Sequence, residues 1–241
     1  MGTNSFYENS SSVELYLEHR HSELSPNKTM EAPAFFRTMG DPAGKRVLDL
    51  GCGDGSFAEH LIARGVAAYH GIDSSILMIE KARAGENAAR ASFELSDIEE
   101  LSLQSAQYDL VTSRMALHYV SDLNRLMSQI RMCLGVAGRV VFSVVHPVIT
   151  SALTSESGPR SNWLVDDYFT QGTRTRQWFN QEVSWQHRTV EQYVKALTGN
   201  GMRLTDLCEC EPEASAFAQA PDELVRRRRI PLVLLLAADA N

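Results

Sequence analysis

The sequence predicts an α/β fold in which helices cover both faces of a mostly parallel sheet. Two observations support this. Short apolar runs typical of buried strands alternate with helix-like segments along most of the 241 residues. The first strand also ends in a glycine-rich turn at 51–55, and the next strand ends in Gly71-Ile72-Asp73. Alternating strands and helices form parallel sheets, because each helix carries the chain back across the sheet before the next strand begins.

The elements follow from apolar periodicity and turn residues. The expected strands are 46–50, 67–72, 91–94, 108–113, 138–144, 203–210 and 231–238. The expected helices are 13–21, 28–39, 55–64, 75–84, 98–101, 121–134 and 189–200. The second helix ends at Gly40-Asp41-Pro42, which cannot continue it. No adequate crossover helix separates the last two strands, so we expect them to pair as an antiparallel hairpin at the sheet edge.

A single domain covering 1–241 is expected, with two additions to its alternating core. A chain of this length can form one sizeable core. Residues 1–40 are interpreted as an N-terminal helical cap. Residues 146–188 break the alternation and are rich in aromatic side chains, which argues against disorder. We interpret this insert as a lid over the substrate.

The composition, 44% hydrophobic and 22% charged, is that of an ordinary soluble protein. A net charge of −7 disfavours nucleic acid as a partner, because phosphate binding needs a basic face. The basic run Arg226 to Arg229 is interpreted as a solvated turn in a loop. No metal site is expected, because the four cysteines lack ligand spacing. With no signal peptide or membrane span in view, a cytoplasmic monomer or homodimer with reduced thiols is expected.

The glycine turn indicates a nucleoside cofactor that lacks a diphosphate. Its pattern is G-x-G-x-G, and Ser56 stands where dinucleotide enzymes carry a third glycine. Asp49 and Asp54 flank the turn, where carboxylates repel a diphosphate but suit an ammonium and a sulfonium. Asp73 lies 22 residues after Gly51, at a spacing that suits hydrogen bonds from both ribose hydroxyls.

The string VLDLGCGDG at 47–55, followed by Gly71-Ile72-Asp73, resembles the first motif of class I S-adenosylmethionine-dependent methyltransferases. The resemblance implies a Rossmann-like seven-stranded sheet of order 3-2-1-4-5-7-6, with strand 7 antiparallel. It also implies S-adenosyl-L-methionine as the cofactor. Segments at 142–147, 168–174 and 187–189 resemble a bacterial subgroup that acts on small molecules.

Cofactor contacts are expected at the carboxyl ends of the strands, where ligands of open α/β sheets bind. Gly51 and Gly53 should let the backbone approach the methionine moiety, with Asp49 near its ammonium. Arg20 suits a clamp on the cofactor carboxylate, although a solvated helix face is an alternative. By resemblance Asp97 holds the adenine amino group, unless it only caps a helix. The other expected cofactor-binding residues are Tyr16, Cys52, Asp73, Ser74, Met78, Ile98 and Ser113.

Three histidines are candidate general bases, because imidazole titrates near neutrality. His146 is preferred, since it ends a central strand directly before the lid. His118 and His187 are the others, and simple packing at a helix start is the alternative for His118. Arg188 suits an acidic substrate group or a pair with Asp166. The candidate substrate-binding residues are Tyr119, Trp163, Tyr168, Phe169, Arg174, Trp178 and Arg188.

The sequence therefore predicts methyl transfer from S-adenosyl-L-methionine to a small molecule. The aromatic lid favours an aromatic or amine-bearing natural product of secondary metabolism, methylated on nitrogen, oxygen or carbon. Two alternatives remain open. One is an NAD(P)-dependent oxidoreductase, which shares the strand–helix–strand unit but is disfavoured by Ser56 and the acidic turn. The other is a non-catalytic cofactor-binding partner subunit, which would show cofactor affinity without turnover.

Overall fold

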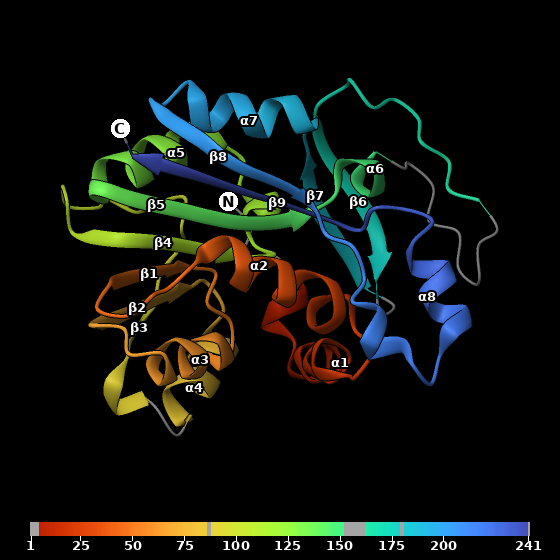
Figure 1. Cartoon of the computed structure of the whole chain (residues 1–241), viewed down its shortest axis with the longest axis horizontal. Helices are drawn as coiled ribbons and strands as arrows, with labels where there is room; N and C mark the ends of the chain where they lie inside the picture. Colours follow the sequence, from red (N-terminus) through yellow and green to blue (C-terminus); the bar gives the residue numbers. More distant parts are fainter. Residues whose placement is uncertain (1–4, 86–87, 152–161, 179–180, 241) are drawn as a thin grey trace.

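The computed structural model describes residues 5–85, 88–151, 162–178 and 181–240. Its centre is a seven-stranded sheet of order β3-β2-β1-β4-β5-β9-β8 (Figure 1). The strands are β1 (Arg46–Leu50), β2 (Ala68–Asp73), β3 (Ser92–Leu95), β4 (Tyr108–Arg114), β5 (Leu134–Val145), β8 (Met202–Glu209) and β9 (Val233–Ala240). Strand β9 runs antiparallel to both of its neighbours, and the other pairings are parallel. The predicted strand order and the reversed last strand are confirmed.

Helices cover both faces of the sheet because alternate strand residues point to opposite sides. Leu48 and Leu50 pack in the core shared with α5 and α7, whereas Val47 packs in the core shared with α2 and α3. The helices are α1 (Ser10–His21), α2 (Ala32–Met39), α3 (Ser56–Ala63), α4 (Ile76–Ala84), α5 (Leu123–Cys133), α6 (Pro147–Thr150), α7 (Val190–Thr198) and α8 (Pro221–Arg227). None of them, within the described ranges, has the length and apolarity that a membrane crossing requires.

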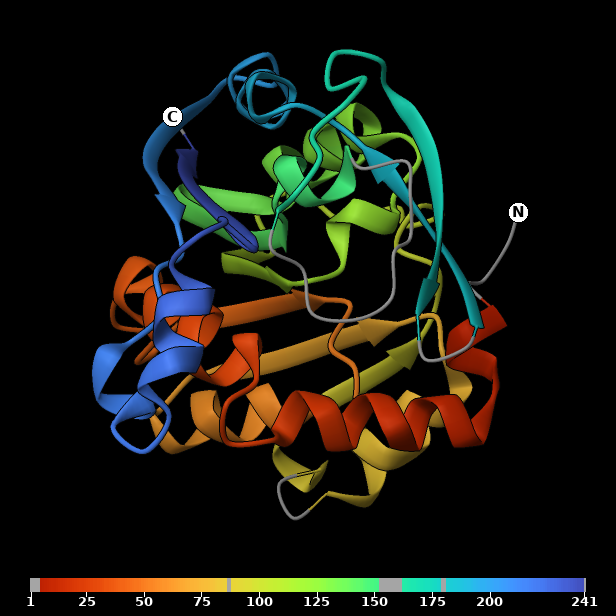
Figure 2. The same ribbon diagram turned by 90° about the vertical axis from the view of Figure 1, so that its right-hand side faces the viewer.

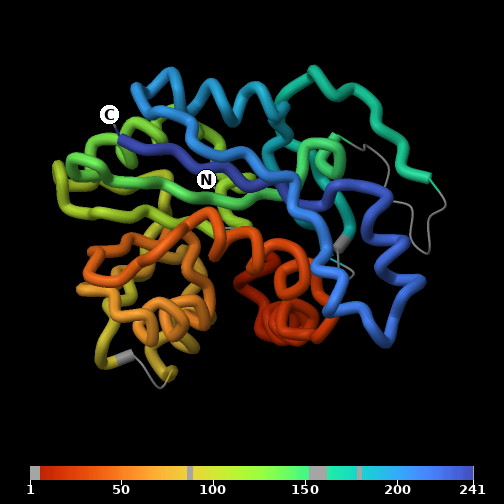
Figure 3. Tube along the Cα trace, viewed as in Figure 1, coloured from red at the N-terminus to blue at the C-terminus, as the bar shows by residue number. Residues whose placement is uncertain are grey.

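The cap and the lid lie beyond the carboxyl ends of the parallel strands. In Figure 1, β5 points toward a second, two-stranded sheet made of β6 (Gly172–Trp178) and β7 (Gln181–His187). The tube in Figure 3 shows α1, in red, on this same side of the molecule. In Figure 2 the 3-10 turn η1 (Ser5–Glu8) lies at the foot of this hairpin, and η1 contacts α1, α4 and β7. The ends of the strands are thus enclosed by segments distant in sequence.

The β6–β7 hairpin was not predicted, although the insert was interpreted as a lid. Strand β6 alternates threonine and arginine at 173–176, so it shows no alternation between apolar and polar residues. Its identity as a strand depends on pairing with β7, in which Val183 and Trp185 are buried. Gln181 also donates a hydrogen bond to the Ser12 hydroxyl, which ties the hairpin to α1.

One local prediction is wrong and another holds only in part. The expected helix 98–101 is a turn, because the Asp97 carboxylate accepts a hydrogen bond from the Glu99 backbone N–H at 2.9 Å and closes an Asx turn. The basic run is a turn only in part, since Arg226 and Arg227 form the last turn of α8 and Arg228 and Arg229 lie in the turn after it. Glu223 pairs with Arg226 and Arg227, three and four residues earlier on the same helix face.

The predicted helix 28–39 is present in two parts. Residues Asn27–Glu31 form a π-helical turn, η2, and α2 continues directly from it. Because π-helical geometry shifts side chains relative to an ordinary helix, this turn sets where Glu31 enters the interior. Glu31 is fully buried, which matters for the site described next.

Candidate active site

The glycine turn forms one wall of the site, directly after β1. Gly51 and Gly53 have φ values of +76° and +59°, in the left-handed region that favours glycine. A Cβ atom on Gly51 would lie 2.3 Å from the Cβ of Ala116, in the segment after β4. A Cβ atom on Gly53 would meet nothing within 4 Å. Gly51 therefore allows two chain segments to touch, whereas Gly53 borders open space where a ligand can approach the backbone.

We expect Gly51→Ala to lower the free energy of unfolding by about 3 kcal/mol. The left-handed backbone costs about 1–2 kcal/mol for alanine, and the clash with Ala116 adds about 1–3 kcal/mol. Gly53→Ala is the matched control, because it carries only the backbone cost of about 1–2 kcal/mol. Urea unfolding of both variants checks this, and equal losses would contradict the packing role of Gly51.

Asp73, the last residue of β2, holds the loops on either side of it. One carboxylate oxygen accepts a hydrogen bond from the Gly53 N–H at 2.9 Å, and the other accepts one from the Ser75 N–H at 2.9 Å. Burial raises the pKa of Asp73, and the two N–H donors partly offset this. Each carboxylate oxygen has a second lone pair, so the group can also accept bonds from two vicinal hydroxyls.

Asp49 lies one layer deeper and joins three strands. Its two carboxylate oxygens accept hydrogen bonds from the Tyr69 hydroxyl at 2.6 Å and the Thr112 hydroxyl at 2.8 Å. Asp49 and Thr112 are direct neighbours in the β1–β4 register, so their side chains meet on one face. Burial raises the pKa of Asp49, against the effect of these two bonds. Its contact with a cofactor ammonium remains a prediction.

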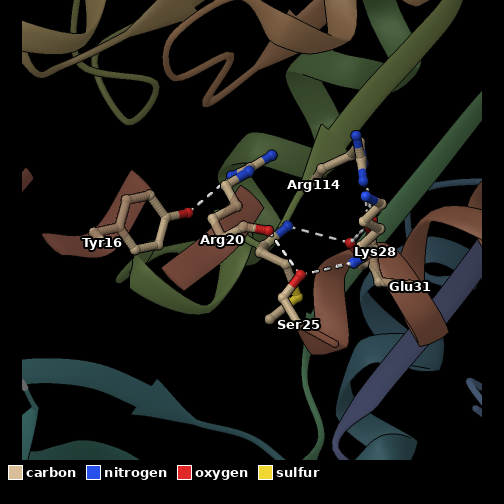
Figure 4. A network of polar contacts seen from close by, with 8 residues as sticks. Tyr16, Arg20, Ser25, Lys28, Glu31 and Arg114 are labelled. Atoms are coloured by element: carbon tan, nitrogen blue, oxygen red, sulfur yellow. Dashed lines mark hydrogen bonds and ion pairs between the residues drawn. The ribbon is translucent and has the colours of Figure 1, made fainter. Parts of the chain in front are cut away.

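The N-terminal cap adds a cation near the glycine turn. Arg20 donates a hydrogen bond to the Tyr16 hydroxyl at 2.8 Å (Figure 4). Burial lowers the pKa of Arg20, but the influence of Tyr16, Asp54 and Glu31 outweighs it, so that the net shift is upward. The guanidinium is therefore charged and close to the acidic turn, as a carboxylate clamp requires.

Glu31 and Arg114 form a buried ion pair that sequence reasoning missed. Glu31 is fully buried, and it accepts hydrogen bonds from two guanidinium nitrogens of Arg114 and from the Ser143 hydroxyl at 2.8 Å. Arg114 ends β4 and Ser143 lies near the end of β5. Figure 4 shows this pair to the right of Arg20 and Ser25. The network fastens the cap to the two strand ends. The available signal was a glutamate in the otherwise apolar stretch 30–36.

Aromatic rings from four elements pack against one another. We define the aromatic cluster as Phe6, Tyr7, Tyr16, His118, Tyr119 and Trp185. The hydroxyl oxygens of Tyr7 and Tyr119 lie 3.3 Å apart, and the Tyr7 and Tyr16 rings pack edge to face at 5.5 Å. His118 and Tyr119 belong to the 3-10 turn η4 (Leu117–Tyr119), which begins three residues after Arg114, the last residue of β4. Their ring centroids lie 4.3 Å apart, and His118 lies 6.4 Å from Trp185.

Two of the three candidate bases use both ring nitrogens in structural bonds. In His146, Nδ1 accepts from the Val148 N–H at 3.1 Å and Nε2 bonds to Glu209 at 3.0 Å. In His187, Nε2 donates to the Tyr168 carbonyl at 2.9 Å and Nδ1 bonds to the Thr150 hydroxyl at 2.7 Å.

His118 differs from the other two histidines in its free nitrogen. Its Nδ1 is buried and has no hydrogen-bond partner among the described residues. Burial, with the nearby Arg188 charge, lowers the pKa of His118 to about 3. The ring is therefore neutral at pH 7, and one nitrogen remains available to a ligand.

Comparison with known proteins identifies the family. A family model described as a methyltransferase domain matches residues 16–201, well over half of the chain. The chain belongs to this family. An S-adenosylmethionine-dependent methyltransferase from Mesorhizobium loti is 29% identical, with a TM-score of 0.82, and the match covers 92% of this chain and 99% of that one. A Haemophilus influenzae protein is 31% identical over 80% of this chain and 81% of its own length.

A further relative is similar over a shorter part. The ubiquinone biosynthesis O-methyltransferase of Coxiella burnetii is 30% identical over 105 residues, which are 43% of this chain and 44% of that enzyme. The chain is thus a methyltransferase that uses S-adenosyl-L-methionine, and the predicted reaction class and cofactor are confirmed. The nicotinamide and non-catalytic alternatives are set aside.

The residues of this methyltransferase fit its cofactor. Gly53 leaves its backbone open, Asp73 presents a carboxylate beside it, and Arg20 donates to the Tyr16 hydroxyl and forms no ion pair within the described ranges. The remaining predicted cofactor residues lie along the same strand ends. Cys52 and Met78 are buried, Ser74 is exposed, Ser113 donates to the Leu50 carbonyl at 2.7 Å, and Ile98 is half-buried in the turn after β3.

The predicted substrate residues of the methyltransferase lid do not all meet. Trp163 donates to the Val148 carbonyl at 2.9 Å, and the Tyr168 hydroxyl accepts from the Val190 N–H at 3.3 Å. Phe169 is 85% exposed, away from the aromatic cluster. Arg174 donates to the Thr170 carbonyl at 2.8 Å and pairs with Asp167. The side chain of Trp178 lies outside the described residues.

Tyr119 and Arg188 are the two predicted substrate residues that lie beside His118. Tyr119 packs against its ring, and the Arg188 charge acts on its pKa. Arg188 donates to the backbone carbonyls of Val120 at 2.5 Å and Ser121 at 2.8 Å. Among the described residues it has no ion pair, so the alternative pairing with Asp166 is not formed.

Proposed function

We propose that this methyltransferase methylates a small aromatic molecule on a hydroxyl or amine, with His118 as the general base. The observation that carries the proposal is the buried Nδ1 of His118, which lies at the end of β4 without a partner in the described part of the chain. The curated O-methyltransferase relative favours a hydroxyl acceptor, although the chain spans under half of that relative's length. An acceptor hydroxyl would satisfy this nitrogen and pass its proton to it.

The chain contributes binding, alignment and proton removal. S-adenosyl-L-methionine supplies a methyl group on a sulfonium, which is already a good leaving group. Asp73 and the backbone around Gly53 hold the nucleoside side of the site, and Arg20 holds the carboxylate side. The aromatic cluster excludes water and presents flat surfaces on which an aromatic acceptor can stack. Alignment of this kind supplies up to about 7–11 kcal/mol in favourable cases.

The proposal also assigns roles to the cap and the lid. Residues 1–40 and 146–188 are assigned to one methyltransferase domain covering 1–241, and the described parts of both segments enclose the acceptor rather than forming a separate unit. Contacts of η1 with α4 and β7, and of Gln181 with Ser12, support this because they join cap, lid and core. We place the enzyme in the cytoplasm as a monomer or homodimer that acts in secondary metabolism.

His118→Asn is expected to lower turnover by about 10²–10⁴-fold, because it removes the proposed proton acceptor. The acceptor is first found by incubating the enzyme with methyl-labelled S-adenosyl-L-methionine and a panel of phenols and amines. Affinity for S-adenosylhomocysteine, measured by calorimetry, should stay within about twofold, since His118 lies on the acceptor side.

The matched control is His146→Asn, whose ring nitrogens are held by Val148 and Glu209. It should lower the melting temperature while leaving the turnover of folded enzyme nearly unchanged. The opposite pattern, with His146→Asn losing turnover and His118→Asn retaining it, would move the base to His146. Cofactor binding with no labelled acceptor in the panel would count against a phenol or amine acceptor.

A further inference from the structure

Three unpartnered polar atoms gather where η4 meets the end of β7. His118 Nδ1, Trp185 Nε1 and Arg188 Nη1 are all buried and lack hydrogen-bond partners among the described residues. The His118 and Trp185 rings lie 6.4 Å apart, edge to face. Arg188 bonds to the carbonyls of Val120 and Ser121, immediately after η4, which brings its guanidinium to the same place. Buried polar atoms are rarely left unpaired, so three of them at one place suggest a ligand.

The charge at this place is positive and uncompensated. In the described ranges Arg188 forms no ion pair with a carboxylate; its partners are the carbonyls of Val120 and Ser121 and the hydroxyl of Tyr193. Trp185 Nε1 can only donate a hydrogen bond, and so can Arg188 Nη1. A buried cation with an unused N–H is costly until an anion or another acceptor reaches it. Two N–H donors, one of which belongs to a cation, suit the oxygens of an acid group.

We propose that Arg188 Nη1 and Trp185 Nε1 bind an acid group of the acceptor, a carboxylate or a phosphate, while His118 Nδ1 meets the acceptor hydroxyl. This assignment rests on the proposed function and narrows its substrate class to acidic aromatic hydroxy compounds. The Arg188 charge repels an ammonium group and so excludes acceptors that carry one. The inference therefore replaces the substrate preference expected from the sequence, for amines, with a preference for acids.

The same arrangement links acceptor binding to the strength of the base. After burial, the Arg188 charge is the second cause that lowers the pKa of His118. A bound anion offsets that charge and so raises the pKa of His118, while burial, the larger cause, continues to lower it. The base becomes stronger only when an acid acceptor is in place. Proton removal is thereby coupled to recognition of the acid group.

The test uses the full-length enzyme saturated with S-adenosylhomocysteine and four probes of equal ring size. Calorimetry measures benzoate, phenyl phosphate, benzamide and benzylamine. We expect benzoate or phenyl phosphate to bind at least tenfold more tightly than benzamide, and benzylamine to bind most weakly. Whichever of the two acids binds more tightly identifies the acid group, and equal affinities would mean that either is accepted.

Arg188→Gln should abolish the preference for acids over benzamide. Arg176→Gln is the matched control, because Arg176 is a lid arginine whose guanidinium stacks on Trp163 at 5.4 Å, and it should retain the preference. Trp185→Phe keeps the ring and removes only Nε1–H, so it should weaken acid binding several-fold even if Arg188→Gln does not fold. In the natural protein, benzoate should also raise the pKa of His118 measured by NMR.

The inference is overturned if benzamide binds as tightly as both acids, or if folded Arg188→Gln keeps the preference. An unchanged acid affinity in Trp185→Phe overturns the hydrogen bond from Trp185 Nε1 to the acid group. An unmoved pKa of His118 overturns the coupling between acid binding and the base. Binding of S-adenosylhomocysteine without any acid preference defeats this inference and leaves methyl transfer standing. Failure to bind S-adenosylhomocysteine defeats the proposed function, and the inference with it.

Discussion

Asp73→Ala is expected to weaken binding of S-adenosylhomocysteine by about 10²–10⁴-fold. The carboxylate has capacity for two charge-assisted hydrogen bonds from the ribose, each contributing roughly 1.5–3 kcal/mol. Its loss also releases the Gly53 and Ser75 N–H groups that it now holds at 2.9 Å. The glycine turn would lose its anchor in the same step. Isothermal titration calorimetry of the variant against the natural protein measures the change directly.

Two further variants separate the ribose contact from general effects. Asp73→Asn keeps an acceptor but loses the charge, so its affinity should fall between those of Asp73→Ala and the natural protein. Asp109→Asn removes a carboxylate at the opposite end of the sheet, where Arg46 binds it at 2.8 Å. This control should change affinity by less than about twofold. Unchanged affinity in Asp73→Ala would remove Asp73 from its assigned role.

Glu31→Ala is expected to lower the free energy of unfolding by about 3–5 kcal/mol, because it leaves the Arg114 guanidinium buried without its partner. The side chain of Arg114 is only 10% exposed, so water cannot replace the lost carboxylate. In a chain of this size the melting temperature should fall by about 6–20 °C. Since the pair joins the cap to the ends of β4 and β5, affinity for S-adenosylhomocysteine should fall as well. Calorimetric melting measures the loss of stability.

A double variant and a surface pair test the burial argument. Glu31→Leu combined with Arg114→Met should recover most of the lost stability, because both charges leave the interior together. Glu23 pairs with Lys28 on the surface, where the two side chains are 85% and 50% exposed. Glu23→Ala should therefore change stability by less than about 0.5 kcal/mol. A double variant no more stable than Glu31→Ala would contradict the explanation.

The residues predicted for the nucleoside half of the site lie together in the structure, because local geometry places them there. Gly51 and Gly53 take left-handed backbone conformations that follow from their positions in one turn. Asp73 reaches that turn because its strand is the direct neighbour of β1. Most residues of this wall of the site therefore come from a short stretch of sequence. What it did not contain is the contact between Gly51 and Ala116, which depends on a segment more than sixty residues away.

For the acceptor half of the site, the sequence indicated the segments involved but not which histidine has a free nitrogen. Sequence reasoning preferred His146, since it ends a central strand beside the lid. Whether a histidine nitrogen is free depends on its partners, and Glu209 of β8 supplies one to His146. His118 has no such partner within the described chain. No periodicity or spacing encodes that difference.

By itself, the sequence determined the glycine turn and the antiparallel hairpin at the sheet edge, and its resemblance to a known family supplied the sheet order and the cofactor class. These features arise from apolar alternation and from motifs whose members are close along the chain. Tertiary structure alone decided the lid hairpin, the buried pair of Glu31 with Arg114, and the histidine that keeps a free nitrogen. Each of these depends on hydrogen bonds between groups that are distant along the chain. In a packed interior, such partners are set by which segments lie side by side and not by the order of the segments in the sequence.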